Sequence, residues 1–212
     1  MTLSRFLVYT GAVALLVTYA VAARDAEPTP ALPVYRSADL APEWVDLDDP
    51  TEPAHRVGPF ALTDQTGRAV TEADLDGRVT IVSFFFARCT SICPSLRSNL
   101  ADVQAAVAGD DGVQILSLTV QPEHDTAAVL AAYAGANGVD ADHWRLLTGD
   151  RDAIYGLART SFFADVAEGG FLHTETVYLL DAERRIRGVY TGTLPLEVQH
   201  LIGDAQALRA AA

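Results

Sequence analysis

The chain contains two cysteines, Cys89 and Cys93, which lie four residues apart in the stretch FFFARCTSICPSL. Side chains at this spacing can face one another across a loop and the first turn of a helix. Such a pair can form a disulfide, exchange disulfides with a partner through a mixed disulfide, or bind a soft metal ion as thiolates. The peptide dipoles at a helix N-terminus lower the pKa of a nearby thiol, and this favours the thiolate needed for exchange and for metal binding.

A purely structural disulfide is the weakest of these interpretations. A chain of 212 residues, of which 50% are hydrophobic, can form a hydrophobic core without a stabilising disulfide bond. A bridge between residues four apart also closes a very small loop, and therefore restricts the unfolded chain little. Exchange and metal binding both stay open on the residues alone.

The elements around the cysteines alternate between strand and helix. Residues 79–86 are a continuous apolar, β-rich run, typical of a central buried strand, and the cysteines follow its carboxyl end. Apolar residues then recur at helical spacing from Leu96 to Val107, which predicts a helix that starts near Pro94. The remaining pattern predicts strands over 113–120 and 143–148, hairpins over 60–70 and 176–192, a helical turn capped by Thr71, and helices capped by Asp125 and Asp150 or starting at Pro195.

This order predicts an α/β fold with a central mixed sheet in a thioredoxin-like arrangement. Open α/β sheets place their sites at the carboxyl ends of the strands, where the cysteines stand. The domain is expected to span residues 57–212, after a linker rich in proline and acidic residues over 25–56.

Residues 1–24 are expected to be a membrane anchor or a signal segment. The stretch 6–23 carries no charge and approaches the ~20 apolar residues that span a bilayer. We favour an uncleaved anchor over cleavage after the small-residue motif at 20–22. Arg5 precedes the apolar stretch and acidic residues follow it, which favours a single anchor in the cytoplasmic membrane with the domain in the periplasm. Cleavage would instead release the domain into the periplasm.

The charge of the chain argues against one class of partner. The formal net charge is -13, and every Lys or Arg position is an arginine. Nucleic acid needs a basic face, so binding to DNA or RNA is not expected. We interpret the excess of acidic residues as a surface that is exposed to water.

Six segments, in order, resemble the SCO/SenC family of copper-binding, thioredoxin-like proteins: FALTDQTGRAV, FFFARCTSICP, TVQPEHDT, WRLLTGD, FLHTETVYLLD and RIRGVYTGT. The resemblance implies one copper ion, Cu(I) or Cu(II), bound by Cys89, Cys93 and His173. It also implies a role in building the copper centre of cytochrome c oxidase. One position departs from the family, because Gln121 stands where its members usually carry aspartate, and a lost carboxylate there could alter docking or metal exchange.

Copper suits this donor set, because two thiolates and one imidazole form a soft site of low coordination. Closed zinc sites take four protein ligands, and the sequence offers no obvious fourth. The other histidines, His55, His124, His143 and His200, are expected to be ordinary surface residues.

Two functions follow from these predictions. The first is a copper metallochaperone that delivers to the copper-bearing oxidase subunit, with another copper chaperone or a thiol reductant as a further partner. The alternative is a thiol–disulfide oxidoreductase that reduces cysteines of that subunit, or a redox or copper sensor. The CxxxC spacing favours metal mildly, because dedicated oxidoreductases of this fold use CxxC. The sequence leaves chaperone and reductase open.

Overall fold

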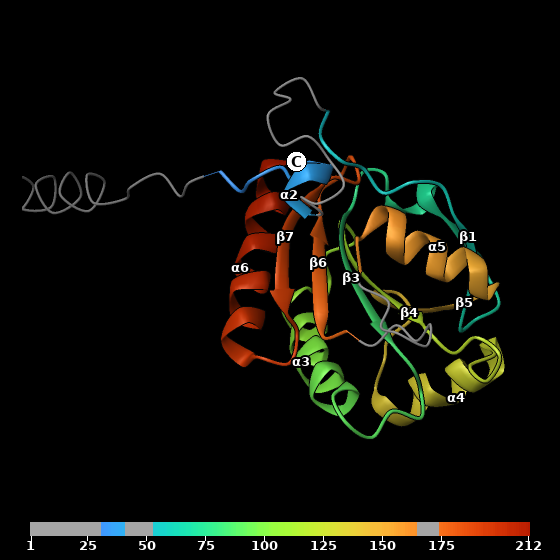
Figure 1. Ribbon diagram of the computed structural model, residues 1–212. Coiled ribbons are helices and arrows are strands. Elements are labelled where there is room, and N and C mark those ends of the chain that lie inside the picture. The colour runs from blue at the N-terminus through green and yellow to red at the C-terminus, as the bar shows by residue number, and fades with distance from the viewer. Residues whose placement is uncertain (1–30, 41–52, 165–173) are drawn as a thin grey trace, which may run out of the picture. The chain divides into compact units, whose positions relative to one another are not determined.

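The computed structural model describes residues 31–40, 53–164 and 174–212, and from Pro33 onward the chain forms one compact unit (Figure 1). The expected anchor, most of the expected linker and His173 lie outside the described residues. Within the described ranges, no helix is long and apolar enough to cross a membrane. The domain boundary at residue 57 stays a prediction.

Seven strands form one sheet in the order β2-β1-β5-β4-β3-β6-β7. Their bounds are β1 Ala61–Asp64, β2 Ala69–Thr71, β3 Val79–Phe85, β4 Val113–Thr119, β5 Trp144–Thr148, β6 Thr176–Leu180 and β7 Ile186–Thr191. The three central strands β3, β4 and β5 are parallel, and the outer pairs are antiparallel. The predicted central mixed sheet is therefore confirmed.

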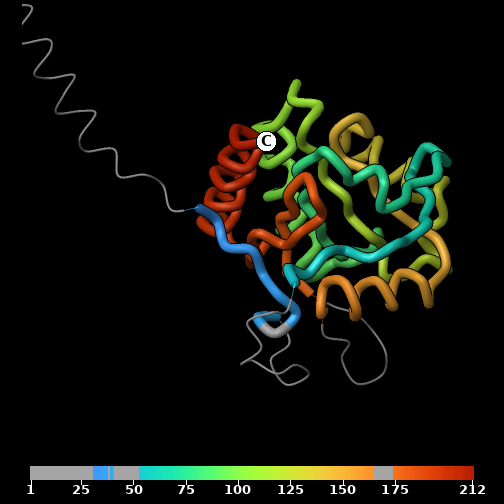
Figure 2. The backbone as a smooth tube through the Cα atoms, turned by 90° about the horizontal axis from the view of Figure 1, so that it is seen from above, coloured from blue at the N-terminus to red at the C-terminus, as the bar shows by residue number. Residues whose placement is uncertain are grey.

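Helices cover both faces of this sheet. They are α2 Ser37–Leu40, the 3-10 helix η2 Glu72–Leu75, α3 Cys93–Ala106, α4 Ala127–Asn137, α5 Arg151–Ser161 and α6 Pro195–Ala211. Viewed from above, α3 and α4 lie on the side of the molecule opposite α5 (Figure 2). α6 packs against α3 and β7. The sheet is thus enclosed between two helical layers, and both faces of its central strands are removed from water.

Burial on both faces explains the apolar runs in the sequence. All seven residues of β3 and all seven of β4 are buried. On the α5 face, the ring of Phe84 meets the rings of Phe162 and Tyr178 edge-on, with centroids 5.7 and 6.5 Å apart. Aromatic pairs in this geometry add to the stabilisation from their buried area. The strand that leads to the cysteines is therefore buried along its whole length.

The helix caps agree with the sequence prediction at Thr71 and Asp150 and disagree at Asp125. The Asp150 side chain accepts a hydrogen bond from the Ala153 N–H at 2.9 Å, so the predicted cap of α5 is confirmed. The predicted cap of α4 is wrong, because Thr126 takes that position and accepts from the Val129 N–H. Asp125 is instead only 1% exposed. Threonine and aspartate are both good cap residues, so local sequence did not separate the two neighbours.

The described part of the expected linker lies against the domain. The Tyr35 N–H donates to the Ile186 carbonyl oxygen at 3.1 Å, and the Arg187 Nε donates to the Pro33 carbonyl oxygen at 2.7 Å. The His55 N–H in turn donates to the Tyr35 carbonyl oxygen at 3.1 Å. These bonds attach two short segments of the N-terminal region to the turn and strand around β7.

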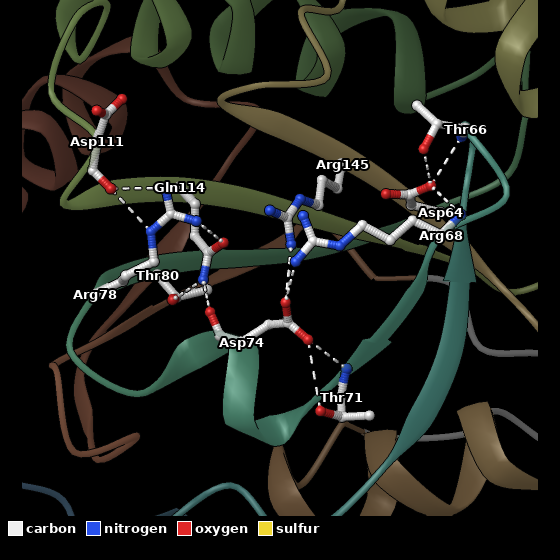
Figure 3. Close-up of polar contacts among 10 residues, drawn as sticks. All are labelled: Asp64, Thr66, Arg68, Thr71, Asp74, Arg78, Thr80, Asp111, Gln114 and Arg145. Atoms are coloured by element: carbon white, nitrogen blue, oxygen red, sulfur yellow. Dashed lines mark hydrogen bonds and ion pairs between the residues drawn. The ribbon is translucent and has the colours of Figure 1, made fainter.

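A network of charged and amide side chains occupies the edge of the sheet where β3, β4 and β5 begin (Figure 3). Asp74, in η2, accepts from Arg68 Nη2 at 2.8 Å and lies 3.5 Å from Arg145 Nη1. Gln114 donates to the Asp74 carbonyl oxygen at 2.8 Å and accepts from Arg78 Nη1 at 2.9 Å. We call these five residues the amino-edge network. They fasten η2 to the sheet at the edge opposite the cysteines.

Candidate metal centre

The two cysteines lie on different kinds of structure. β3 ends at Phe85 and α3 begins at Cys93, so Cys89 lies in the connecting loop and Cys93 is the first residue of the helix. The Cys89 N–H donates to the Phe86 carbonyl oxygen at 3.2 Å, which closes a turn in the loop. Pro94 occupies the first turn of α3, where its missing N–H costs nothing. Both thiols are free; Cys89 is half-buried and Cys93 is 5% exposed.

This arrangement separates the pKa values of the two thiols. Burial alone would raise the pKa of Cys89, but hydrogen bonds from the side chains of Cys93 and Ser91 and from their backbone N–H groups lower it to about 6. Burial, the hydrogen bond that Cys93 donates to Cys89 and the negative charge on Cys89 together raise the pKa of Cys93 to about 12. At neutral pH the pair therefore holds one proton, on Cys93.

The position of Cys93 shows that burial outweighs the helix dipole here. A thiol at a helix N-terminus is expected to have a lowered pKa. Cys93 stands at that position, yet its pKa is raised, because the thiolate form would have to lose its hydration inside the protein. The pair consists of an accessible thiolate and a buried thiol that donates a hydrogen bond to it.

A pocket beside Cys93 is mainly apolar, and its lining includes two serines whose hydroxyls bond to each other. Tyr133 from α4 and Trp144 from β5 line it together with Cys93. In the same lining, the Ser83 and Ser117 hydroxyl oxygens lie 2.7 Å apart, and Trp144 Nε1 donates to Ser117 Oγ at 2.9 Å. Because these hydroxyls satisfy one another, they are poor candidates for metal ligands, and the two sulfur atoms are the donors of the described site.

The third expected ligand, His173, lies outside the described residues, and its role stays a prediction. Within the described ranges, no group of three His, Cys, Asp or Glu side chains could hold a metal ion. Thr174, the residue that follows His173, hydrogen-bonds through its hydroxyl to the Thr176 hydroxyl at the start of β6, at 2.8 Å. β6 pairs antiparallel with β3, so it begins at the edge of the sheet where β3 ends and the cysteine loop departs.

Of the four remaining histidines, two are exposed and two, His55 and His143, are half-buried. His124 and His200 are exposed, as expected for surface residues. The surface prediction is wrong for His55, whose Nε2 lies 2.8 Å from the Ser161 carbonyl oxygen and whose ring meets Phe163 edge-on with centroids 4.8 Å apart. It joins the N-terminal region to the end of α5 and lies apart from the thiols in the fold.

One residue at the cysteine edge was missed by reasoning from sequence. The buried Asp125 carboxylate accepts from the Ala87 N–H at 3.0 Å and from Thr119 Oγ1 at 2.5 Å. Ala87 lies two residues before Cys89. The sequence contained a signal for this role, because Asp125 follows the carboxyl end of β4, the strand parallel to β3. The sequence instead predicted Asp125 as the cap of the next helix, an interpretation that needs only local residues.

Gln121, at the position where the resemblance leads us to expect an aspartate, contributes through its backbone. Its N–H donates to Thr119 Oγ1 at 3.1 Å, and its carbonyl oxygen accepts from the Asp125 N–H at 2.9 Å. These bonds hold the β4–α4 loop in place next to the cysteine loop.

The mixed sheet between two helical layers, with a dithiol at the carboxyl end of a central parallel strand, defines a thioredoxin-like domain with a soft donor pair. The family model described as SCO1/SenC matches residues 48–206, and the chain belongs to the SCO1/SenC family. The resemblance read from the sequence is thereby confirmed.

Individual relatives support this assignment. The SCO1 protein homolog of Bacillus subtilis is 28% identical over 159 residues, which are 72% of this chain and 82% of that protein. Matches to mitochondrial SCO1 and SCO2 homologs cover less than half of those proteins.

Two solved structures are similar in fold and sequence. BsSco, a member of the Sco family of cytochrome c oxidase assembly proteins in which a disulfide switch was identified, is 28% identical with a TM-score of 0.66, covering 74% of this chain and 95% of that one. ScoI of Bradyrhizobium japonicum, solved with copper bound, is 28% identical with a TM-score of 0.59, covering 73% and 99%.

Proposed function

We propose that this protein is an extracytoplasmic copper metallochaperone. It binds one copper ion through Cys89, Cys93 and His173 and delivers it to the copper-bearing subunit of cytochrome c oxidase. The observation that carries this proposal is the thiol pair at the end of β3, in which one sulfur is already a thiolate at neutral pH. The copper-bound ScoI and the oxidase-assembly family of BsSco support the choice of metal and recipient.

The difference between the two sulfurs suits a transfer site. Cys89 is the half-buried thiolate on a loop, and an incoming thiolate of a partner can reach metal from its side. Cys93 is the buried donor on a helix, so it stays fixed while the ligands exchange. Because Cys93 holds its proton until metal arrives, copper binding releases a proton.

The same asymmetry favours thiol–disulfide exchange as a second candidate function. The Cys89 thiolate would attack a disulfide of the partner and form a mixed disulfide. Cys93, after losing its proton to water, would attack Cys89 and release the partner as a dithiol. Two electrons pass to the partner, and the chain is left with a Cys89–Cys93 disulfide. The disulfide switch identified in BsSco supports this candidate.

The proposed location follows from the N-terminal sequence. The uncharged stretch 6–23 would serve as a single anchor in the cytoplasmic membrane, with the domain in the periplasm. Alkaline phosphatase fused after residue 24 is expected to be active, whereas the same fusion after residue 4 is expected to be inactive. Equal activity of the two fusions would contradict the proposed orientation.

Anaerobic copper titration of the full-length protein in detergent, with metal analysis, tests the proposed ligands. We expect one Cu(I) per wild-type chain and loss of tight binding in C89S, C93S and H173A. H200A serves as a matched control, because His200 is an exposed histidine on α6. Unchanged binding by H173A would remove His173 from the ligand set.

A trapping experiment separates the second candidate from the first. C93S lacks the resolving thiol, so an oxidoreductase would accumulate as a mixed disulfide with an oxidised recipient domain. A chaperone without this activity gives no such adduct.

A further inference from the structure

Asp125 is the most deeply buried of the carboxylates at 1% exposure in the part of the chain that the structure describes. Asp64 and Asp181, at 3% and 6%, come next. Burying a carboxylate is costly unless it receives hydrogen bonds or a counter-charge. Asp181 is paired with Arg185 and Arg187. In the described ranges Asp125 has no arginine partner and depends on hydrogen-bond donors.

The donors to Asp125 come from the end of β4 and from the loop that carries Cys89. The Ala87 N–H lies 3.0 Å from Asp125 Oδ2, and Thr119 Oγ1 lies 2.5 Å from the same oxygen. Thr119 Oγ1 in turn accepts from the Gln121 N–H at 3.1 Å. The result is a chain of bonds from the β4–α4 loop, through the Asp125 carboxylate, to the backbone of the loop that carries Cys89.

The two cysteines depend on different supports, and this makes the Ala87 contact important. Cys93 is held by α3, whose first turn packs into the core. Cys89 has no helix to hold it and depends on its loop. The loop is attached at its start by the bond from the Val120 N–H to the Phe85 carbonyl oxygen, at 2.8 Å. The bond from Ala87 to Asp125 adds an attachment two residues before the sulfur.

We propose that Asp125 is a positioning residue of the thiol site: its carboxylate fixes Ala87 and so holds Cys89 within reach of Cys93. This inference rests on the proposed copper function for its metal-bound part, while its metal-free part concerns the dithiol alone. Gln121 takes part through its N–H group, which any residue other than proline would supply. The carboxylate that supports the site is therefore at position 125, although position 121 lacks one.

A series of four variants of the full-length protein tests this role. D125A removes the acceptor, D125N keeps an acceptor oxygen without the charge, and T119V removes the hydroxyl that links Asp125 to Gln121. D64A is the matched control. Asp64 is also a buried aspartate that accepts from a threonine hydroxyl, Thr66 Oγ1 at 2.6 Å, but it lies in the β1–β2 hairpin (Figure 3).

The first readout is Cu(I) affinity by competition with a chelator. Residues that orient metal ligands change affinity by about 10-fold to 100-fold when they are removed. We expect D125A to lose about 10-fold or more, D125N and T119V to lose less, and D64A to bind as the wild type does. Urea unfolding of each variant shows whether D64A and D125A are destabilised to a similar degree. Equal affinity in D125A and D64A would overturn the proposal.

The second readout needs no metal. In glutathione buffers, two cysteines form a disulfide more readily when the fold holds their sulfur atoms close together. If Ala87 is no longer fixed by Asp125, Cys89 lies out of reach of Cys93 more of the time, so the equilibrium constant for the Cys89–Cys93 disulfide is expected to be several-fold lower in D125A than in the wild type and D64A. If the wild type binds no copper, the metallochaperone proposal fails, and the disulfide equilibrium still decides the role of Asp125. Equal constants in all variants would refute it.

Discussion

The amino-edge network and the cysteine edge lie at opposite ends of the same parallel strands, and they use polar groups in opposite ways. At the amino edge, opposite charges are paired: Asp74 contacts Arg68 and Arg145 (Figure 3). At the cysteine edge, hydrogen bonds from Cys93 and Ser91 stabilise the charge on Cys89, and the described residues form no ion pair with it. The ion pairs at the amino edge hold its side chains in one arrangement. At the cysteine edge, the Cys89 thiolate has no counter-charge among the described residues and can bind a metal ion or a partner.

The pKa values express the same difference. Burial would raise the pKa of Asp74, but the Thr71 N–H and the charges of Arg68 and Arg145 hold it below its ordinary value. Its charge therefore contributes to stability. At the cysteine edge, burial keeps Cys93 protonated while Cys89 is a thiolate. The ion pairs at the amino edge stabilise the fold. At the cysteine edge, one sulfur is a thiolate and the other a thiol, and both can take part in chemistry.

The largest change in stability is expected from Asp74→Ala. It leaves Arg145 buried without its partner, so the free energy of unfolding should fall by about 3 kcal/mol in urea titrations at pH 7. The wild-type contribution is present above about pH 4 and is lost as the pH falls through the lowered pKa of Asp74, so the variant should lose less stability on acidification. Copper stoichiometry should be unchanged.

A matched control for this prediction is Asp76→Ala. Asp76 pairs with Arg184 at 3.0 Å, but its side chain is 55% exposed. Exposed pairs contribute at most about 1 kcal/mol, so this variant should be close to the wild type. Equal losses in the two variants would contradict the structural role given to the amino-edge network.

Copper affinity is expected to depend on pH by about 10-fold per unit between pH 6 and pH 9, or about 1.4 kcal/mol per unit. Binding must displace the proton of Cys93, whose pKa is about 12, while Cys89 is already deprotonated above pH 6. Below pH 6 both thiols are protonated, so the two sulfur ligands alone should contribute about two decades per unit. Chelator competition across this range measures it, and an affinity independent of pH would contradict the one-proton state.

The alkylation profile sharpens the contrast between the two sulfurs. In the reduced, metal-free protein, Cys89 should react with iodoacetamide with a midpoint near pH 6, and Cys93 should stay unmodified up to pH 9. Peptide mass spectrometry assigns the modified residue. Ser91→Ala, which removes one hydrogen bond to Cys89, should move the midpoint upward. Faster modification of Cys93 than of Cys89 would reverse the assignment of the two thiols.

The smallest effect is expected from Thr126→Ala, next to Asp125. It removes the cap of α4 and should cost about 1 kcal/mol of stability. Copper affinity should stay at the wild-type value, because Thr126 bonds within α4. Circular dichroism in urea and chelator competition measure the two quantities. A loss of affinity here would mean that the β4–α4 loop supports the thiols as a whole.

Much of the fold could be predicted from local patterns. The continuous apolar run 79–86 predicted a strand buried on both faces, and β3 is buried throughout. Pro94 predicted the start of a helix, and α3 begins one residue earlier. The cap by Asp150 was predicted and the cap by Asp125 was not, because Asp125 bonds to Ala87, which lies 38 residues away in the sequence. The conformational preferences of neighbouring residues contain no information about a hydrogen-bond partner so far away in the sequence.

The sequence by itself determined that two thiols stand at the carboxyl end of a central strand, and its motifs indicated the family. The tertiary structure decided how those thiols differ. Cys93 is buried because α3 packs its first turn beside Tyr133 and Trp144, residues from elements much later in the chain. Burial removes water from one sulfur and leaves the other within reach. This difference in hydration sets which cysteine carries the proton, and it depends on contacts that exist only in the folded protein.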